Sequence, residues 1–129
     1  MKLNCLIPAV LLCCFSVTSF ACPKPKACPS ISSIQKFGIN PTLFLDDHTN
    51  TWEGEHGFDN YDGDYPKWSF HINGIPGKDN SEAYANAIAS LKSLVQVSKE
   101  PEPGISNQQW VCSYRTSQGY PAILITPLI

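Results

Sequence analysis

Two cysteines near the start of the chain, Cys22 and Cys28, are each followed by proline. A cysteine thiolate can ligate ferric haem iron, and the fixed backbone angle of the next proline directs the chain away from the porphyrin. Lys24 and Lys26 lie between the two cysteines and could pair with the propionates. No CxxCH motif occurs, so covalent haem attachment is not expected. The pattern makes non-covalently bound hemin a candidate ligand.

Three histidines, His48, His56 and His71, add nitrogen ligands for iron or another transition metal. His48 and His56 stand eight residues apart in an acidic stretch, which is a weak metal-binding pattern. His71 falls in a segment with strand periodicity, where a polar residue on the outer face is the simpler interpretation. We treat the three histidines, together with Cys22 and Cys28, as candidate hemin contacts.

Three aspartates, Asp59, Asp62 and Asp64, offer hard oxygen ligands for a cation such as calcium. Asn60 and Gly63 between them would permit the tight turn that calcium loops use. The spacing differs from the EF-hand pattern, which has acids at alternate positions and a glutamate at the twelfth. The alternative is a solvated acidic loop without a metal.

The sequence contains no complete catalytic constellation. It lacks a nucleophile elbow, a zinc-peptidase helix and a glycine-rich phosphate loop. Cys112 and His71 could form a thiol nucleophile and its base. Cys112, however, stands in an apolar strand-like segment, which is more typical of a buried or disulfide-bonded cysteine. We therefore expect a protein that is not an enzyme.

The first residues have the features of a cleaved secretion signal. Lys2 is followed by an apolar run over residues 6–20, which is shorter than the roughly 20 residues that span a bilayer. Ser19 and Ala21 are the small residues that a signal peptidase needs for a cut before Cys22. Lipoprotein processing at Cys22 and a retained membrane anchor are the alternatives. We expect a secreted or periplasmic protein without a transmembrane segment after cleavage of residues 1–21.

The remaining 108 residues are enough for one domain and no more. Without the signal, 8 basic and 11 acidic residues remain, a net charge of −3, and no basic face for nucleic acid is indicated. Residues 22–29 carry three prolines and are expected to form an extended, exposed leader. Residues 30–129 are expected to form the single domain.

Three cysteines, Cys22, Cys28 and Cys112, remain after cleavage, so at most one intramolecular disulfide can form. We favour Cys28–Cys112, because Cys112 lies in a strand-like core segment and Cys28 begins the folded region. The alternative is Cys22–Cys28, which the intervening prolines disfavour by holding that segment extended.

Hydrophobic periodicity predicts an α+β fold. The expected elements are a short helical turn at 30–36, strands at 42–46, 67–73, 109–115 and 120–126, a long helix at 80–97, an acidic loop at 46–64 and a polar linker at 99–104. A short strand around Trp52 that interrupts the acidic loop is the alternative for that segment. We expect a small antiparallel sheet of about four strands with the long helix packed on one face.

An alternative function starts from the acidic stretch, which has seven acids and no Lys or Arg over residues 46–64. Its aromatic residues Trp52, Phe58, Tyr61 and Tyr65 are of the type that dominates protein interfaces. An acidic aromatic loop at 46–65 would suit a secreted protein that contacts a host protein.

Several segments resemble those of a known family. They are the paired Cys-Pro leader, CPSISSIQKFG at 28–38, WSFHINGI at 68–75, WVCSY at 110–114 and ITP at 125–127. Together they resemble small secreted proteins of unknown function from intracellular bacterial pathogens, a family that includes members named hemin-binding protein. The resemblance implies a shared fold and hemin binding, but no known ligand residues.

Overall fold

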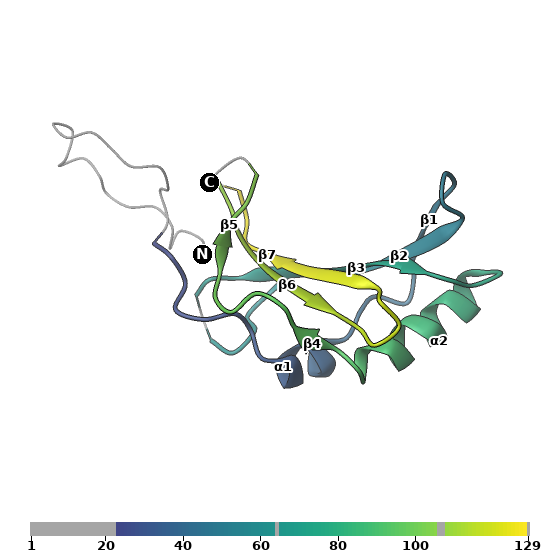
Figure 1. Ribbon diagram of the computed structural model, residues 1–129, viewed down its shortest axis with the longest axis horizontal. Coiled ribbons are helices and arrows are strands. Elements are labelled where there is room, and N and C mark those ends of the chain that lie inside the picture. The colour runs from purple at the N-terminus through teal and green to yellow at the C-terminus, as the bar shows by residue number, and fades with distance from the viewer. Residues whose placement is uncertain (1–22, 64, 106–107, 129) are drawn as a thin grey trace, which may run out of the picture.

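The computed structural model describes residues 23–63, 65–105 and 108–128 of the 129-residue chain. These residues form one antiparallel sheet of seven strands, with two short helices on one face (Figure 1). The elements in chain order are α1 (Ile31–Phe37), β1 (Phe44–Asp46), β2 (Thr51–Asp59), β3 (Trp68–Ile75), α2 (Asn80–Leu91), β4 (Val95–Gln96), β5 (Glu102–Pro103), β6 (Trp110–Arg115) and β7 (Pro121–Ile125). The sheet order is β1-β2-β3-β7-β6-β4, and β5 also pairs with β6.

The fold is therefore mainly β, and the expected α+β fold of about four strands with one long helix was wrong. The helix expected at 80–97 ends at Leu91. The Ser93 hydroxyl donates to the Ser90 carbonyl at the helix end, and Val95 then begins strand β4 against Arg115. β-Branched residues favour a strand, so the apolar residues after Leu91 do not continue the helical stripe.

The acidic stretch at 46–64 was also misinterpreted as mostly loop, because β2 occupies nine of its residues. Its glycines are typical of loops, but Gly54 lies buried within the strand. A Cβ there would lie 2.9 Å from the Ile39 side chain. This glycine allows close packing of another segment over the strand, which is a known use of glycine in sheets.

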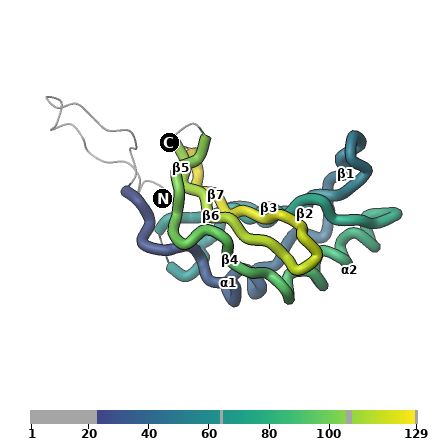
Figure 2. The backbone as a smooth tube through the Cα atoms, viewed as in Figure 1, coloured from purple at the N-terminus to yellow at the C-terminus, as the bar shows by residue number. Residues whose placement is uncertain are grey.

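Two segments expected to be solvated pack onto the body. The linker expected at 99–104 contains strand β5 and the buried Pro101. The leader expected to be exposed has Pro25, Cys28 and Pro29 buried. The chain trace in Figure 2 shows the start of the described chain lying at the end of the sheet beside β5. Proline rings are apolar, so they gain from burial even where the backbone is extended.

Other predictions are confirmed. Helix α1 begins after Ser30, whose hydroxyl accepts a hydrogen bond from the Ser33 N–H at 3.2 Å. Helix α2 begins after Asp79, whose carboxylate accepts from the Glu82 N–H at 2.9 Å. Strand β3 alternates as expected, and β6 and β7 form the predicted antiparallel pair.

The core lies between the sheet and the helices. Phe70, Ile72 and Leu124 from the central strands and Ala83 and Ala87 from α2 are all fully buried. The predicted disulfide is confirmed, because Cys28 and Cys112 are bonded, with a Cα–Cα distance of 5.8 Å. It joins the leader to β6, the strand between β7 and the edge strand β4.

The approach to α2 gives a stability prediction. A Cβ at Gly77 would lie 2.6 Å from the Ala83 backbone nitrogen and 2.8 Å from its Cα. We expect Gly77→Ala to lower the free energy of unfolding by about 1–3 kcal/mol, because a clash with backbone is not relieved by a side-chain rotation. The matched control is Gly57→Ala, where a Cβ meets no atom within 4 Å. Equal urea midpoints for the two variants would contradict the prediction.

Candidate functional site

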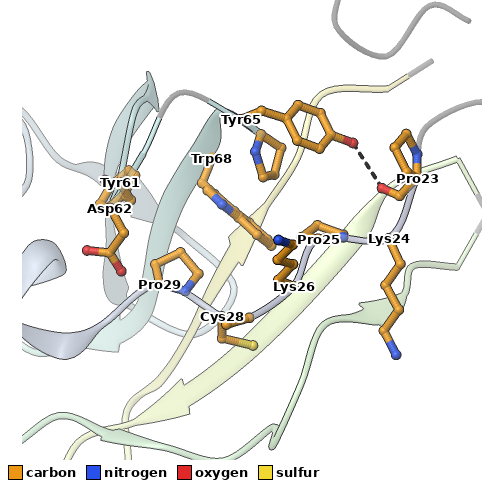
Figure 3. A pocket seen from close by; sticks show the side chains of 12 residues that line it. Pro23, Lys24, Pro25, Lys26, Cys28, Pro29, Tyr61, Asp62, Tyr65 and Trp68 are labelled. Atoms are coloured by element: carbon orange, nitrogen blue, oxygen red, sulfur yellow. Dashed lines mark hydrogen bonds between the residues drawn. The ribbon is translucent and has the colours of Figure 1, made fainter.

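The leader forms one wall of a pocket of about 530 Å³ at the end of the sheet (Figure 3). Residues 23–29 supply that wall, and the opposite side comes from the segment that connects β2 to β3 and from the start of β3. Tyr61, Tyr65 and Trp68 are its aromatic residues. The volume lies within the range of small-molecule sites, about 300–1,000 Å³.

Several contacts hold the leader in place. The Tyr65 hydroxyl donates to the Pro23 carbonyl at 2.9 Å, as Figure 3 shows. The Tyr114 hydroxyl donates to the Pro29 carbonyl at 2.6 Å. Between these two points the disulfide ties Cys28 to β6. The leader wall is therefore attached at both of its ends.

The leader also brings two lysines to the pocket. Lys24 and Lys26 are both exposed. The Lys24 ammonium pairs with the Glu100 carboxylate at 2.9 Å, and in Figure 3 its side chain points away from Tyr65 and Trp68. The pocket thus combines an apolar, aromatic lining with cationic groups at its edge.

The tyrosines of the pocket are poor iron ligands. Burial raises the pKa of both Tyr61 and Tyr65, so each phenol keeps its proton at neutral pH. A phenolate is the form of tyrosine that ligates haem iron. Contacts from these residues would therefore be apolar contacts and neutral hydrogen bonds.

The expected hemin contacts are not brought together as one set. Cys28 is in the disulfide, so its sulfur is not a thiolate ligand while that bond is intact. Cys22 lies outside the described residues, directly before Pro23 of the pocket wall.

The three histidines lie in three different places. His48 is exposed between β1 and β2. His56 pairs across strands with Phe70 on the helix-covered face, and its ring lies 5.3 Å from that of Phe37 in α1. His71 pairs with Glu55, which is the cross-strand pair next to His56–Phe70. Neighbouring pairs face opposite sides of a sheet, so the His71 side chain points away from the face that carries His56. His56 and His71 therefore do not share one planar ligand.

The aspartates expected to bind a metal have separate partners. The Asn60 N–H donates to Asp59 and holds the pKa of that carboxyl below its usual value, and the His56 Nε2 lies 3.1 Å from the same carboxylate. Asp62 accepts from both the backbone N–H and the hydroxyl of Ser30. Asp64 lies outside the described residues. A calcium loop at these positions stays a prediction.

A different group of ligand atoms meets on β2 and β3. Glu53, Glu55 and His71 each place one ligand atom within 4.8 Å of the others. Sequence reasoning selected His71 but missed the two glutamates. Glu53 and Glu55 occupy alternate positions, which in a strand places both side chains on one face. This spacing indicates a site only if residues 51–59 are identified as a strand that pairs with β3.

The aromatic residues of the 46–65 stretch are mostly unavailable to a partner. Tyr61 is buried, and Trp52 is half-buried with its indole N–H donating to the Gly77 carbonyl at 2.9 Å. Tyr65 is half-buried against the leader. Phe58 alone of the four is exposed, at 49%.

Comparison of the chain with protein-family models, curated proteins and solved structures finds no match. The resemblance to the family with hemin-binding members therefore stays a prediction. Among the helices in the described part of the chain, none has the length and apolar character needed to cross a membrane.

Proposed function

We propose that the protein is an exported, non-enzymatic binding protein that holds a flat, largely apolar anion, with hemin as the first candidate, in the pocket beside its leader. The pocket itself is the observation that supports this proposal. Its volume, its proline and aromatic lining and its two lysines fit such a ligand. The disulfide is consistent with an oxidising compartment, either the periplasm or the exterior.

In this arrangement, the ring system of hemin lies against Pro23 and Tyr65, the exposed and half-buried apolar residues of the lining, where apolar area is removed from water. The propionates pair with Lys26 and with Lys24, which exchanges its contact with Glu100. Cys22, next in the chain to Pro23, supplies the thiolate for iron because Cys28 is already bonded to Cys112. One cysteine and two lysines thus take the place of the two cysteines and three histidines expected from the sequence.

The test is a hemin titration of the oxidised chain lacking residues 1–21, followed by absorbance. We expect saturable binding with a shifted Soret band. Cys22→Ser should remove the thiolate signature, and Lys24→Gln with Lys26→Gln should weaken binding by about two- to fivefold per lysine, as for exposed ion pairs. Lys92→Gln, an exposed lysine after α2, is the matched control. Non-saturable binding, or equal binding by all variants, would reject hemin as the ligand of this pocket.

The second candidate function, contact with a host protein, keeps one supporting observation. Edge strand β1 exposes Phe44 and Leu45, at 53% and 46%, and β2 exposes Phe58. Exposed apolar residues on an edge strand are a recurring feature of protein interfaces. Binding of a host protein that is lost in Phe44→Asp and retained in Lys26→Gln would favour this candidate over the pocket.

A further inference from the structure

The polar face of the β2–β3 pair carries a compact group of nitrogen and oxygen ligands. Glu55 and His71 are direct cross-strand partners, and Glu53 stands two residues before Glu55 on the same strand. The nearest ligand atoms are the His71 Nδ1 with the Glu53 Oε2 at 3.4 Å and with the Glu55 Oε1 at 3.6 Å. None of the three residues lines the leader pocket.

A hydrogen-bond relay determines which nitrogen of His71 faces the glutamates. The Ser69 hydroxyl donates its one proton to the His56 carbonyl at 3.1 Å. Its oxygen lies 3.0 Å from the His71 Nε2, so it accepts a hydrogen bond from that nitrogen. The neutral imidazole therefore carries its proton on Nε2 and directs the Nδ1 lone pair toward two carboxylates. Three electron-rich atoms meet there, and a cation among them would offset their mutual repulsion.

The separations fit a cation better than a direct hydrogen bond. Both His71–glutamate distances, 3.4 and 3.6 Å, are longer than the 2.7–3.2 Å typical of an N–H···O hydrogen bond. Ligands at about 2.0–2.2 Å from a tetrahedral zinc ion lie about 3.4 Å from one another. The His71–Glu53 and His71–Glu55 distances match two edges of such a coordination shell.

We propose that Glu53, Glu55 and His71 bind one divalent transition-metal cation, for which Zn²⁺ is the reference ion. His71 coordinates through Nδ1 and each glutamate through one oxygen. The mixed set favours such an ion over Mg²⁺ or Ca²⁺, because imidazole nitrogen suits transition metals and the harder ions prefer all-oxygen sites. Two carboxylates and a neutral imidazole balance the charge of the ion, and three protein ligands leave one position for water.

The Ser69 relay supplies the outer support that metal-binding histidines usually have. Ser69 is 5% exposed and its hydroxyl is fixed by the His56 carbonyl. It therefore orients the His71 ring before an ion arrives. The surrounding stretch, with seven acids and no Lys or Arg over residues 46–64, raises the local concentration of cations.

The test is a Zn²⁺ titration of the oxidised, chelator-treated protein in competition with a chromophoric chelator. In the chain lacking residues 1–21, a Cys22→Ser background removes the one remaining cysteine that is not in the Cys28–Cys112 bond. We expect one Zn²⁺ per chain, with affinity lowered at least tenfold by Glu55→Gln or His71→Gln. Ser69→Ala, which removes the outer support, should cost about tenfold. Glu102→Gln and His48→Gln, at exposed positions outside the cluster, are the matched controls.

A second measurement identifies the liganded atom. Zn²⁺ should shift the nitrogen resonance of the His71 Nδ1 and leave those of His48 and His56 in place, and melting curves should show that each variant is folded. Absence of stoichiometric Zn²⁺ binding, or a loss of Zn²⁺ affinity that is equally large in the control variants, would overturn the proposal. Either result would leave the group as a contact between one histidine and two carboxylates without a metal. Because the probe is Zn²⁺ alone, the outcome is independent of hemin binding.

Discussion

Replacing Cys28 and Cys112 together by alanine should lower the free energy of unfolding by about 4–5 kcal/mol. The disulfide closes a loop with a sequence separation of 84, and the chain-entropy model gives this magnitude for a loop of that length. Alanine introduces no new polar group at either buried site, so the effect reports the loss of the cross-link and a small cavity. Domains of this size have only about 5–15 kcal/mol of net stability.

The measurement is urea unfolding followed by far-UV circular dichroism. The matched control is Cys22→Ser, which should leave the urea midpoint unchanged because the described disulfide does not involve Cys22. Reduction of the native protein should reproduce the loss in the double variant. A double variant as stable as the native protein would show that the leader is held by its other contacts alone. Loss of stability in Cys22→Ser would instead indicate a different disulfide.

The disulfide could be predicted because it depends on local signals. Cys112 lies in an apolar alternating segment, and Cys28 stands two residues before Ser30, which caps a short helix that ends at a glycine. Such signals require no knowledge of distant parts of the chain. For the same reason, β3, the β6–β7 pair and the first turn of α2 were predicted with small errors at their ends.

The remaining elements depend on contacts between distant residues. Gly54 in β2 is explained by the approach of Ile39, and short strands β4 and β5 exist only because they pair with β6. Two-residue strands have no periodicity that a sequence pattern could show. The Glu53, Glu55 and His71 group has the same origin, because it appears only when β2 and β3 are in register. The pocket was missed because a proline-rich leader is usually solvated.

The two most buried tyrosines predict a steep loss of stability in alkali. Tyr61 and Tyr114 are 3% and 2% exposed, and burial raises the pKa of each phenol above its usual value of 10.0. Above pH 10 the unfolded chain therefore releases two protons that the folded chain retains. The free energy of unfolding should be unaffected by these groups below pH 10. Above it, the two groups should lower the free energy by up to about 1.4 kcal/mol per pH unit each.

The test compares urea unfolding of the native protein with that of Tyr61→Phe, Tyr114→Phe and the double variant between pH 7 and pH 11.5. Each single substitution should remove about half of the tyrosine-dependent slope, and the double variant should keep only what lysines and other groups contribute. At pH 7 the variants should differ, because Tyr114→Phe breaks the hydrogen bond to the Pro29 carbonyl and costs about 1–2 kcal/mol. Tyr61→Phe should cost little at that pH, since its hydroxyl has no hydrogen-bond partner within residues 23–63, 65–105 and 108–128.

An unchanged alkaline slope in the double variant would show that both phenols ionise as readily in the folded protein as in the unfolded chain. Their burial against the leader would then be too loose to exclude water.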